Sequence, residues 1–164
     1  MKQFIILFIL LFLCNIQIFS QKSTAKEQFI ESDSVILVSH EDTGGENWSP
    51  SDGEFPKLLT VEGNLNTKLI RERHRLQNQQ IVSLASLITA KSNNTSLVEE
   101  KGCYKPHHSI LVYKNGLIQF IELCFECQNF KTSKEFSSIV YFDNYQWGEL
   151  KKFFNSNGLT YRLM

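Results

Sequence analysis

The sequence predicts one α+β domain, in which a mixed or antiparallel sheet of about five strands contains a central hairpin and is covered by two main helices. The first observation is the Asn115-Gly116 pair between two apolar runs, residues 109–113 and 117–124. Both central positions of a two-residue type I′ turn need positive φ, and Asn-Gly supplies them. The second is that both faces of this hairpin are apolar, which is typical of strands between two layers. The third is that two other segments space their apolar residues as amphipathic helices do.

The N-terminus predicts export. Residues 1–20 carry one lysine followed by an apolar run that is too short for a membrane span, which is typical of a secretory signal peptide. We expect cleavage near Ser20 or Gln21 and a single domain over residues 21–164. The mature protein is then expected to be secreted or to lie in the periplasm or cell envelope, with membrane contact only through an uncleaved signal segment.

The charge balance argues against nucleic acid as a partner. The chain has 17 basic and 17 acidic residues, and removal of Lys2 with the signal leaves 16 against 17, a net charge of −1. Recognition of a phosphate backbone uses an excess of positive charge that this chain lacks. The locally basic stretch at residues 68–75 also contains Glu72 and is typical of solvated surface.

The first half of the domain is expected to be mostly strands. Residues 22–33 are polar and predict a loose arm or a short helix, and residues 34–39 predict a buried strand. A long exposed loop follows at residues 40–54, with Trp48 among its turn-forming residues. Two further short strands are expected at residues 57–61 and 68–73.

The second half is expected to contain both main helices. Asn78 is a plausible N-cap for a helix that ends at about Lys91 and has one apolar stripe. After the hairpin, residues 132–135 match a capping box that is expected to start a short helical turn, and residues 139–142 predict a strand. The last helix is expected from about Tyr145 to Asn157, stopped by Gly158; its predicted core face is Trp147, Leu150, Phe153 and Phe154.

The hairpin register brings cysteines and histidines together. If Asn115 and Gly116 form the turn, Lys114 pairs with Leu117, and counting back places His107 opposite Cys124. Cys103 and Cys127 then lie just past the open end. Cys103, His107, His108, Cys124 and Cys127 are therefore the candidate site residues.

A disulfide is the first interpretation of this cluster. Export favours disulfides, and loss of Cys14 with the signal leaves Cys103, Cys124 and Cys127, an odd number. A bridge from Cys103 to either of the others closes a loop worth about 3 kcal/mol, against about 2 kcal/mol for Cys124 to Cys127. The longer bridge is the expected one.

A zinc site is the second interpretation. Zinc takes four thiolate or imidazole ligands, and a Cys-x2-Cys pair supplies two of them. His107 or His108 would join the three cysteines, so zinc is the one cofactor that the sequence suggests. By strand alternation His108 points away from Cys124, so a four-ligand site needs an irregular strand near Pro106.

Two further interpretations use cysteine chemistry. Cys124 and Cys127 could form a redox dithiol, although Glu126 between them would raise the thiol pKa and no helix begins at the motif. A Cys–His nucleophile oriented by Glu122 is the other, but no oxyanion hole or substrate pocket is evident. No catalytic residue is assigned.

The motifs CYKPHH and LCFEC, with a strand, a turn and a strand between them, resemble a group of small uncharacterised bacterial proteins. These carry a Cys-x2-Pro-Arg-His element and a later Cys-Phe-x-Cys, and the exported character of the chain is similar to that of Bacteroidetes proteins. The resemblance covers about the last 60 residues and implies no known activity. It implies that His108 is the histidine of the pattern, because His107 stands where the group tends to have arginine.

These observations predict an exported, non-enzymatic binding or interaction domain of the envelope, stabilised by a cysteine cluster. Its partner is expected to be an envelope or extracellular protein, with the loop around Trp48 as a contact. The alternatives are a zinc-binding protein that uses Cys103, His108, Cys124 and Cys127, or a thiol-disulfide redox protein that uses Cys124 and Cys127.

Overall fold

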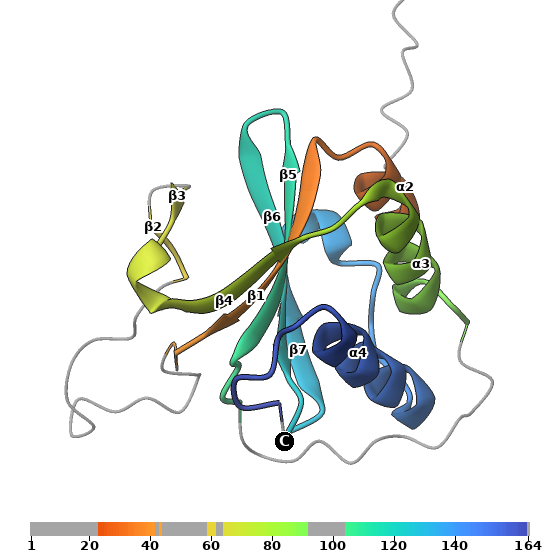
Figure 1. The fold of residues 1–164 in the computed structure, drawn as a ribbon. Coiled ribbons are helices and arrows are strands. Elements are labelled where there is room, and N and C mark those ends of the chain that lie inside the picture. The colour runs from red at the N-terminus through yellow and green to blue at the C-terminus, as the bar shows by residue number, and fades with distance from the viewer. Residues whose placement is uncertain (1–22, 42, 44–58, 62–63, 92–103, 164) are drawn as a thin grey trace, which may run out of the picture.

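The computed structural model describes residues 23–41, 43, 59–61, 64–91 and 104–163. It confirms an α+β fold with a five-stranded antiparallel sheet in the order β4-β1-β5-β6-β7 (Figure 1). The strands are β1 (Ser34–His40), β4 (Ile70–Arg75), β5 (His108–Lys114), β6 (Leu117–Cys124) and β7 (Asn129–Thr132), with a separate pair formed by β2 (Thr60–Val61) and β3 (Asn64–Leu65). The helices are α2 (Ala25–Ile30), α3 (Asn78–Ile88) and α4 (Asn144–Ser156), with short 3-10 turns at Thr67–Leu69 and Lys134–Phe136.

The β5–β6 hairpin has the predicted register and lies in the middle of the sheet. Lys114 pairs with Leu117, and the ladder continues to His108 opposite Leu123. Asn115 and Gly116 form the turn with φ of 52° and 75°, the positive values that a two-residue hairpin needs. The Asn-Gly signal was therefore sufficient to place every pair of this hairpin.

We expect Gly116→Ala to lower the free energy of unfolding by about 1–2 kcal/mol, because φ at this position is in the left-handed region. The matched control is Gly148→Ala in α4, where a Cβ would meet nothing within 4 Å. This second change is expected to stabilise the protein by about 0.5–1 kcal/mol through helix propensity. Urea denaturation of both variants measures the difference, and effects of the same sign would contradict it.

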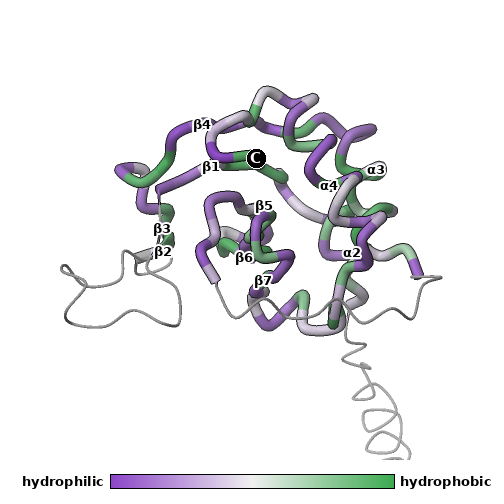
Figure 2. The backbone as a smooth tube through the Cα atoms, turned by 90° about the horizontal axis from the view of Figure 1, so that it is seen from below, coloured by the Kyte–Doolittle hydropathy of each residue, from purple (hydrophilic) through white to green (hydrophobic). Residues whose placement is uncertain are grey.

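The sheet separates two cores of unequal size. Figures 1 and 2 show α2, α3 and α4 on one side of the sheet and the β2–β3 pair on the other. Alternate residues of the central strands face the helices, among them Leu37, Ile110 and Leu123, which are fully buried. Their neighbours face the β2–β3 side and form the smaller cluster of Ile36, Val38, Leu59 and Leu111. This two-sided burial confirms the prediction that the hairpin lies between layers.

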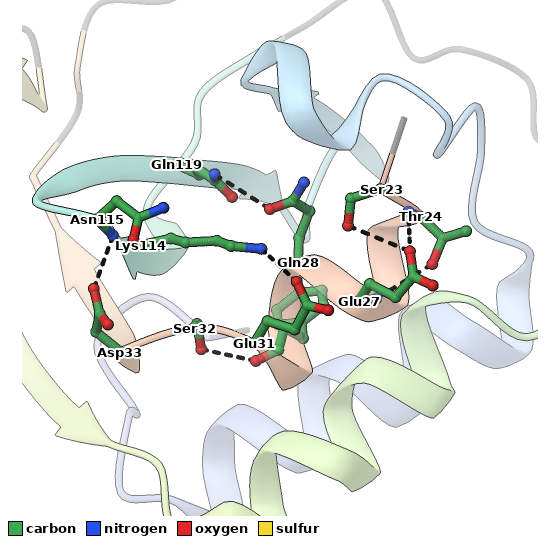
Figure 3. Close-up of polar contacts among 11 residues, drawn as sticks. Ser23, Thr24, Glu27, Gln28, Glu31, Ser32, Asp33, Lys114, Asn115 and Gln119 are labelled. Atoms are coloured by element: carbon green, nitrogen blue, oxygen red, sulfur yellow. Dashed lines mark hydrogen bonds and ion pairs between the residues drawn. The ribbon is translucent and has the colours of Figure 1, made fainter. Parts of the chain in front are cut away.

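Helix α2 and the residues just after it contact the tip of the hairpin through polar side chains (Figure 3). Thr24 and Glu27 form a capping box at its start. Just after the helix, Asp33 Oδ2 accepts a hydrogen bond of 2.9 Å from the backbone N–H of Asn115, and Lys114 Nζ lies 2.9 Å from Glu31 Oε2. Of the two structures expected for residues 22–33, the short helix is therefore the one that forms.

The prediction of a strand at residues 139–142 was wrong, and the fifth strand is β7. Val140 and Tyr141 are 77% and 54% exposed, whereas β7 pairs with β6 from Cys124↔Asn129 to Ile121↔Thr132. The short turn at residues 125–128 returns the chain at once to the open edge of β6, with Gln128 at a φ of 52°. Backbone hydrogen bonds at this edge decide the pairing, and the apolar composition of residues 139–142 does not.

The observed bounds of other strands and helices differ from the predicted ones by a few residues. The strand expected at residues 68–73 is Ile70–Arg75, α3 ends at Ile88, and its N-cap is Gln77. The short helical turn expected after residue 132 forms at Lys134–Phe136, but without the predicted capping box. Its N-cap is Ser133, whose hydroxyl accepts a hydrogen bond from the backbone N–H of Phe120 instead. Helix α4 instead begins with Asp143 as N-cap, and Gly158 follows it at a φ of 80°, as expected of a stop.

Several expectations fall on residues outside the described ranges. These are the signal peptide at residues 1–20, most of the loop at residues 40–54 with Trp48, residues 57–58 of an expected strand, and Cys103. Among the helices that the structure describes, none is long and apolar enough to cross a membrane.

Candidate functional site

Cys124 and Cys127 are bonded to each other by a disulfide. Both are 1% exposed and pack with Tyr104 in a small cluster, and the backbone N–H of Cys127 donates to Cys124 Sγ at 3.2 Å. This corrects the expectation that either of them bridges to Cys103. The chain-entropy argument favoured the longer loop, but the tight turn from β6 to β7 places Cys127 within bonding reach of Cys124.

The two histidines and the cysteine pair do not converge as one set. The ladder of β5 begins at His108, so the expected pairing of His107 with Cys124 is not part of it. His108 lies on the helix side, with its ring centroid 5.0 Å from that of Phe125 and 5.5 Å from that of Phe154. Within the described ranges no group of three His, Cys, Asp or Glu side chains is arranged to hold a metal ion. The zinc site with Cys103 stays a prediction.

A cavity of about 420 Å³ lies at the open end of the hairpin. Its described lining residues are Lys105, His107, His108, Phe125, Glu126 and Arg162. Phe125 and Glu126 are the two residues between the bonded cysteines, so the disulfide holds the turn that carries them. The volume is within the range of about 300–1,000 Å³ that is typical of small-molecule sites.

Glu72 of β4 fixes the C-terminal segment that brings Arg162 to this cavity. Its carboxylate accepts hydrogen bonds from the backbone N–H groups of Thr160 and Tyr161, both at 2.9 Å, and from the hydroxyls of Thr160 and Ser39. Partial burial opposes ionisation, but the hydrogen bonds from Ser39, Tyr161 and Thr160 outweigh it and lower the pKa of Glu72. Glu72 is therefore an ionised anchor at neutral pH.

Arg162 itself is held by backbone geometry and by His107. Its φ of 50° is in the left-handed region, which costs a non-glycine residue about 1–2 kcal/mol and persists only where the surroundings impose it. Arg162 Nη1 lies 3.0 Å from His107 Nε2, and His107 Nδ1 lies 3.3 Å from the carbonyl oxygen of His40. A guanidinium only donates and a carbonyl only accepts, so His107 carries its proton on Nδ1 and accepts at Nε2.

His108 is the buried polar group of the cavity. It is 1% exposed, and its Nε2 atom has no hydrogen-bond partner. Burial lowers its pKa to about 4, the nearby His40 and His107 act in the same direction, and Glu72 and the backbone of Tyr161 oppose the shift. An unsatisfied nitrogen in such a place costs about 1–3 kcal/mol.

The opposite face of the sheet has a separate polar cluster. His40 Nε2 lies 2.9 Å from Ser109 Oγ, and its Nδ1 lies 2.8 Å from the carbonyl oxygen of Glu41. Glu122 of β6 is the cross-strand partner of Ser109. Burial raises the pKa of Glu122, while the hydrogen bond from the Tyr104 hydroxyl at 3.4 Å and the charge of Lys131 lower it. His40 and Ser109 are both 0% exposed, so their hydrogen bond is internal to the fold.

No family model, curated protein or solved structure matches this chain. The resemblance to exported Bacteroidetes-like proteins therefore stays a prediction, and the site is defined by its geometry.

Sequence reasoning found part of this site. The CYKPHH and CFEC motifs pointed to the correct end of the hairpin and supplied His107, His108 and the cysteine pair. Lys105, Phe125 and Glu126 lie within or beside the same motifs, so the short spacing was the available signal for them. Arg162 was missed because it is 35 residues beyond Cys127 and reaches the cavity only through the contacts of Glu72 with its neighbours.

Proposed function

We propose that this chain is an exported, non-enzymatic binding domain of the cell envelope whose ligand enters the cavity at the open end of the hairpin. The observation that carries the proposal is the unpartnered Nε2 of buried His108 in a cavity of about 420 Å³. Buried polar atoms are nearly always satisfied in folded proteins. Among the four side-chain atoms that are buried without a partner in the described residues, only Nε2 of His108 belongs to a residue that lines this cavity. The disulfide supports it by stabilising the turn that forms one wall.

Binding is favoured over nucleophilic catalysis by the state of the candidate nucleophiles. Cys124 and Cys127 are bonded to each other, and the hydroxyl of Ser109 is enclosed on the far face of the sheet. A nucleophile needs both a reactive state and access to substrate. In the described part of the chain, Cys124 and Cys127 lack a reactive state and Ser109 lacks access to substrate.

The test is a protein-detected NMR screen of the full mature chain with small anionic, cationic and neutral compounds. At least one class is expected to shift the backbone amides of His107, Phe125 and Glu126 in a saturable manner. The internal control is the second cavity, of about 310 Å³, between α2, the end of α3 and residues 138–141, whose amides should stay unchanged. If no compound perturbs the first cavity, or if all binding is at the second, the proposal is wrong.

A thiol-disulfide redox function is the second candidate, because the bonded pair is a Cys-x2-Cys motif. Its burial argues for a structural role, since attack by an external thiolate needs access to a sulfur atom. We expect native protein treated with glutathione to keep this bond, as measured by intact mass after alkylation. Rapid reduction of the folded protein, with catalysis of disulfide exchange in a substrate, would favour the redox function instead.

A further inference from the structure

We propose that the ligand of this cavity is a small organic monocarboxylate, whose carboxylate is held by Arg162 and His108 and whose apolar part lies against Phe125. This inference rests on the proposed function, because it names the chemical class of ligand for the same cavity. Three independent features of the lining carry it: the formal charge, the orientation of Arg162, and the unsatisfied nitrogen of His108.

The formal charge of the lining favours an anionic ligand. Lys105 and Arg162 contribute two positive charges, and Glu126 contributes one negative charge, so the described lining has a net charge of +1 with neutral histidines. Uptake of a proton at His108 raises this charge to +2. The lining is therefore positive before and after that uptake, which favours an anion over a cation.

Arg162 is oriented before any ligand arrives. One of its five N–H donors is used at the 3.0 Å contact with His107 Nε2, which leaves others for an anion. A guanidinium presents its donors in a fixed planar fork, which matches the two oxygens of a carboxylate. Because His107 is itself fixed by the carbonyl of His40, the fork loses little freedom when it binds.

His108 supplies a second contact, at the buried end. Its ring packs edge-on against the rings of Phe125 and Phe154, and its Nε2 atom is unpartnered. A hydrogen bond between this nitrogen and a carboxylate oxygen needs a proton on Nε2. The one proton of neutral His108 is used at the other ring nitrogen, in the hydrogen bond with the backbone of Tyr161, so the proton for Nε2 is taken from solvent. The titratable groups whose charges act on His108 are His107, Glu72 and, on the opposite face of the sheet, His40, and each is held in a hydrogen bond. The charged groups that line the same cavity are Lys105, Glu126 and Arg162.

The ring of Phe125 provides the surface against which the apolar part of the ligand packs. Phe125 packs against Phe154 and Trp147, with ring centroids at 5.5 and 5.9 Å, so it is a fixed wall. Burial of apolar ligand surface contributes roughly 25 cal/mol per Å². A short alkyl or aromatic group therefore adds affinity that a bare anion such as phosphate lacks.

Isothermal titration calorimetry of the full mature chain tests the proposal with butyrate, its neutral isostere butyramide, and inorganic phosphate. Butyrate is expected to bind at pH 6 with uptake of about one proton, read from buffers of different ionisation enthalpy, and to bind more weakly at pH 8. Arg162→Gln is expected to weaken butyrate about tenfold or more. Arg73→Gln, an exposed arginine of β4, is the matched control and should leave the affinity unchanged.

The outcomes separate this inference from the proposed function. His108→Gln should abolish proton uptake, and amide shifts in the NMR spectrum check that each variant is folded. If butyramide or phosphate shifts the cavity amides while butyrate does not, the monocarboxylate assignment is overturned and the binding function stands. If butyrate binds equally well to Arg162→Gln, or without proton uptake, the assignment is also overturned. If no compound affects the cavity, both proposals fail.

Discussion

Replacement of Phe154 with alanine is expected to lower the free energy of unfolding by about 3–5 kcal/mol, the cost of a large cavity in a core. Phe154 is fully buried on α4, and its ring contacts those of His108 and Phe125. The lost volume would lie directly behind the candidate site. We therefore expect this variant to lose affinity for any cavity ligand as well.

Chemical denaturation monitored by circular dichroism measures this effect. The control is Tyr145→Ala on the same helix, where the side chain is 70% exposed and the change should stay within about 0.5 kcal/mol. Equal effects at the two positions would show that α4 does not pack as described. Unchanged ligand affinity in a destabilised but folded Phe154→Ala protein would show that ligand binding does not depend on the packing of Phe154.

Acid is expected to destabilise the protein through His108. Burial lowers the pKa of His108 to about 4 in the folded state, whereas the unfolded chain has the ordinary value of about 6.5. Between these two values the unfolded state binds more protons, so stability falls as the pH falls through the window. The full contribution is about 3 kcal/mol, present above pH 6.5 and lost by about pH 4.

Urea denaturation at a series of pH values between 4 and 8 tests this expectation in the native chain and in His108→Gln. The variant should be less dependent on pH over the window, whatever its stability at pH 7. Glu72 also loses a contribution in acid, but below its ordinary pKa of 4.5, because its pKa is lowered in the folded state. Parallel pH profiles for the two proteins would contradict the assigned state of His108.

Phe154 and His108, the residues of both predictions, belong to one group of side chains in contact. The rings of Phe154, Phe125 and His108 join the helical core to the cavity, and the disulfide joins the cavity to the β6–β7 turn. Loss of packing in α4 and a change in the protonation of His108 should therefore affect the same site.

The sequence by itself determined the hairpin and the two sides of the sheet. Asn115 and Gly116 specify the turn through their backbone preferences, and the alternation of apolar residues then assigns each side chain to a face. The two main helices also followed from spacing, with boundaries within a few residues. His108 was correctly placed away from Cys124 by the same alternation.

Only the tertiary structure decided the fifth strand, the partner of Cys124 and the role of Arg162. β7 is less apolar than residues 139–142. It nevertheless forms a strand, because the preceding turn places it beside the open edge of β6. The same turn brings Cys127 to Cys124. Arg162 reaches the cavity because Glu72, about 90 residues earlier, binds the backbone beside it. Such contacts depend on where distant segments meet in space, whereas local periodicity records only which way each residue faces.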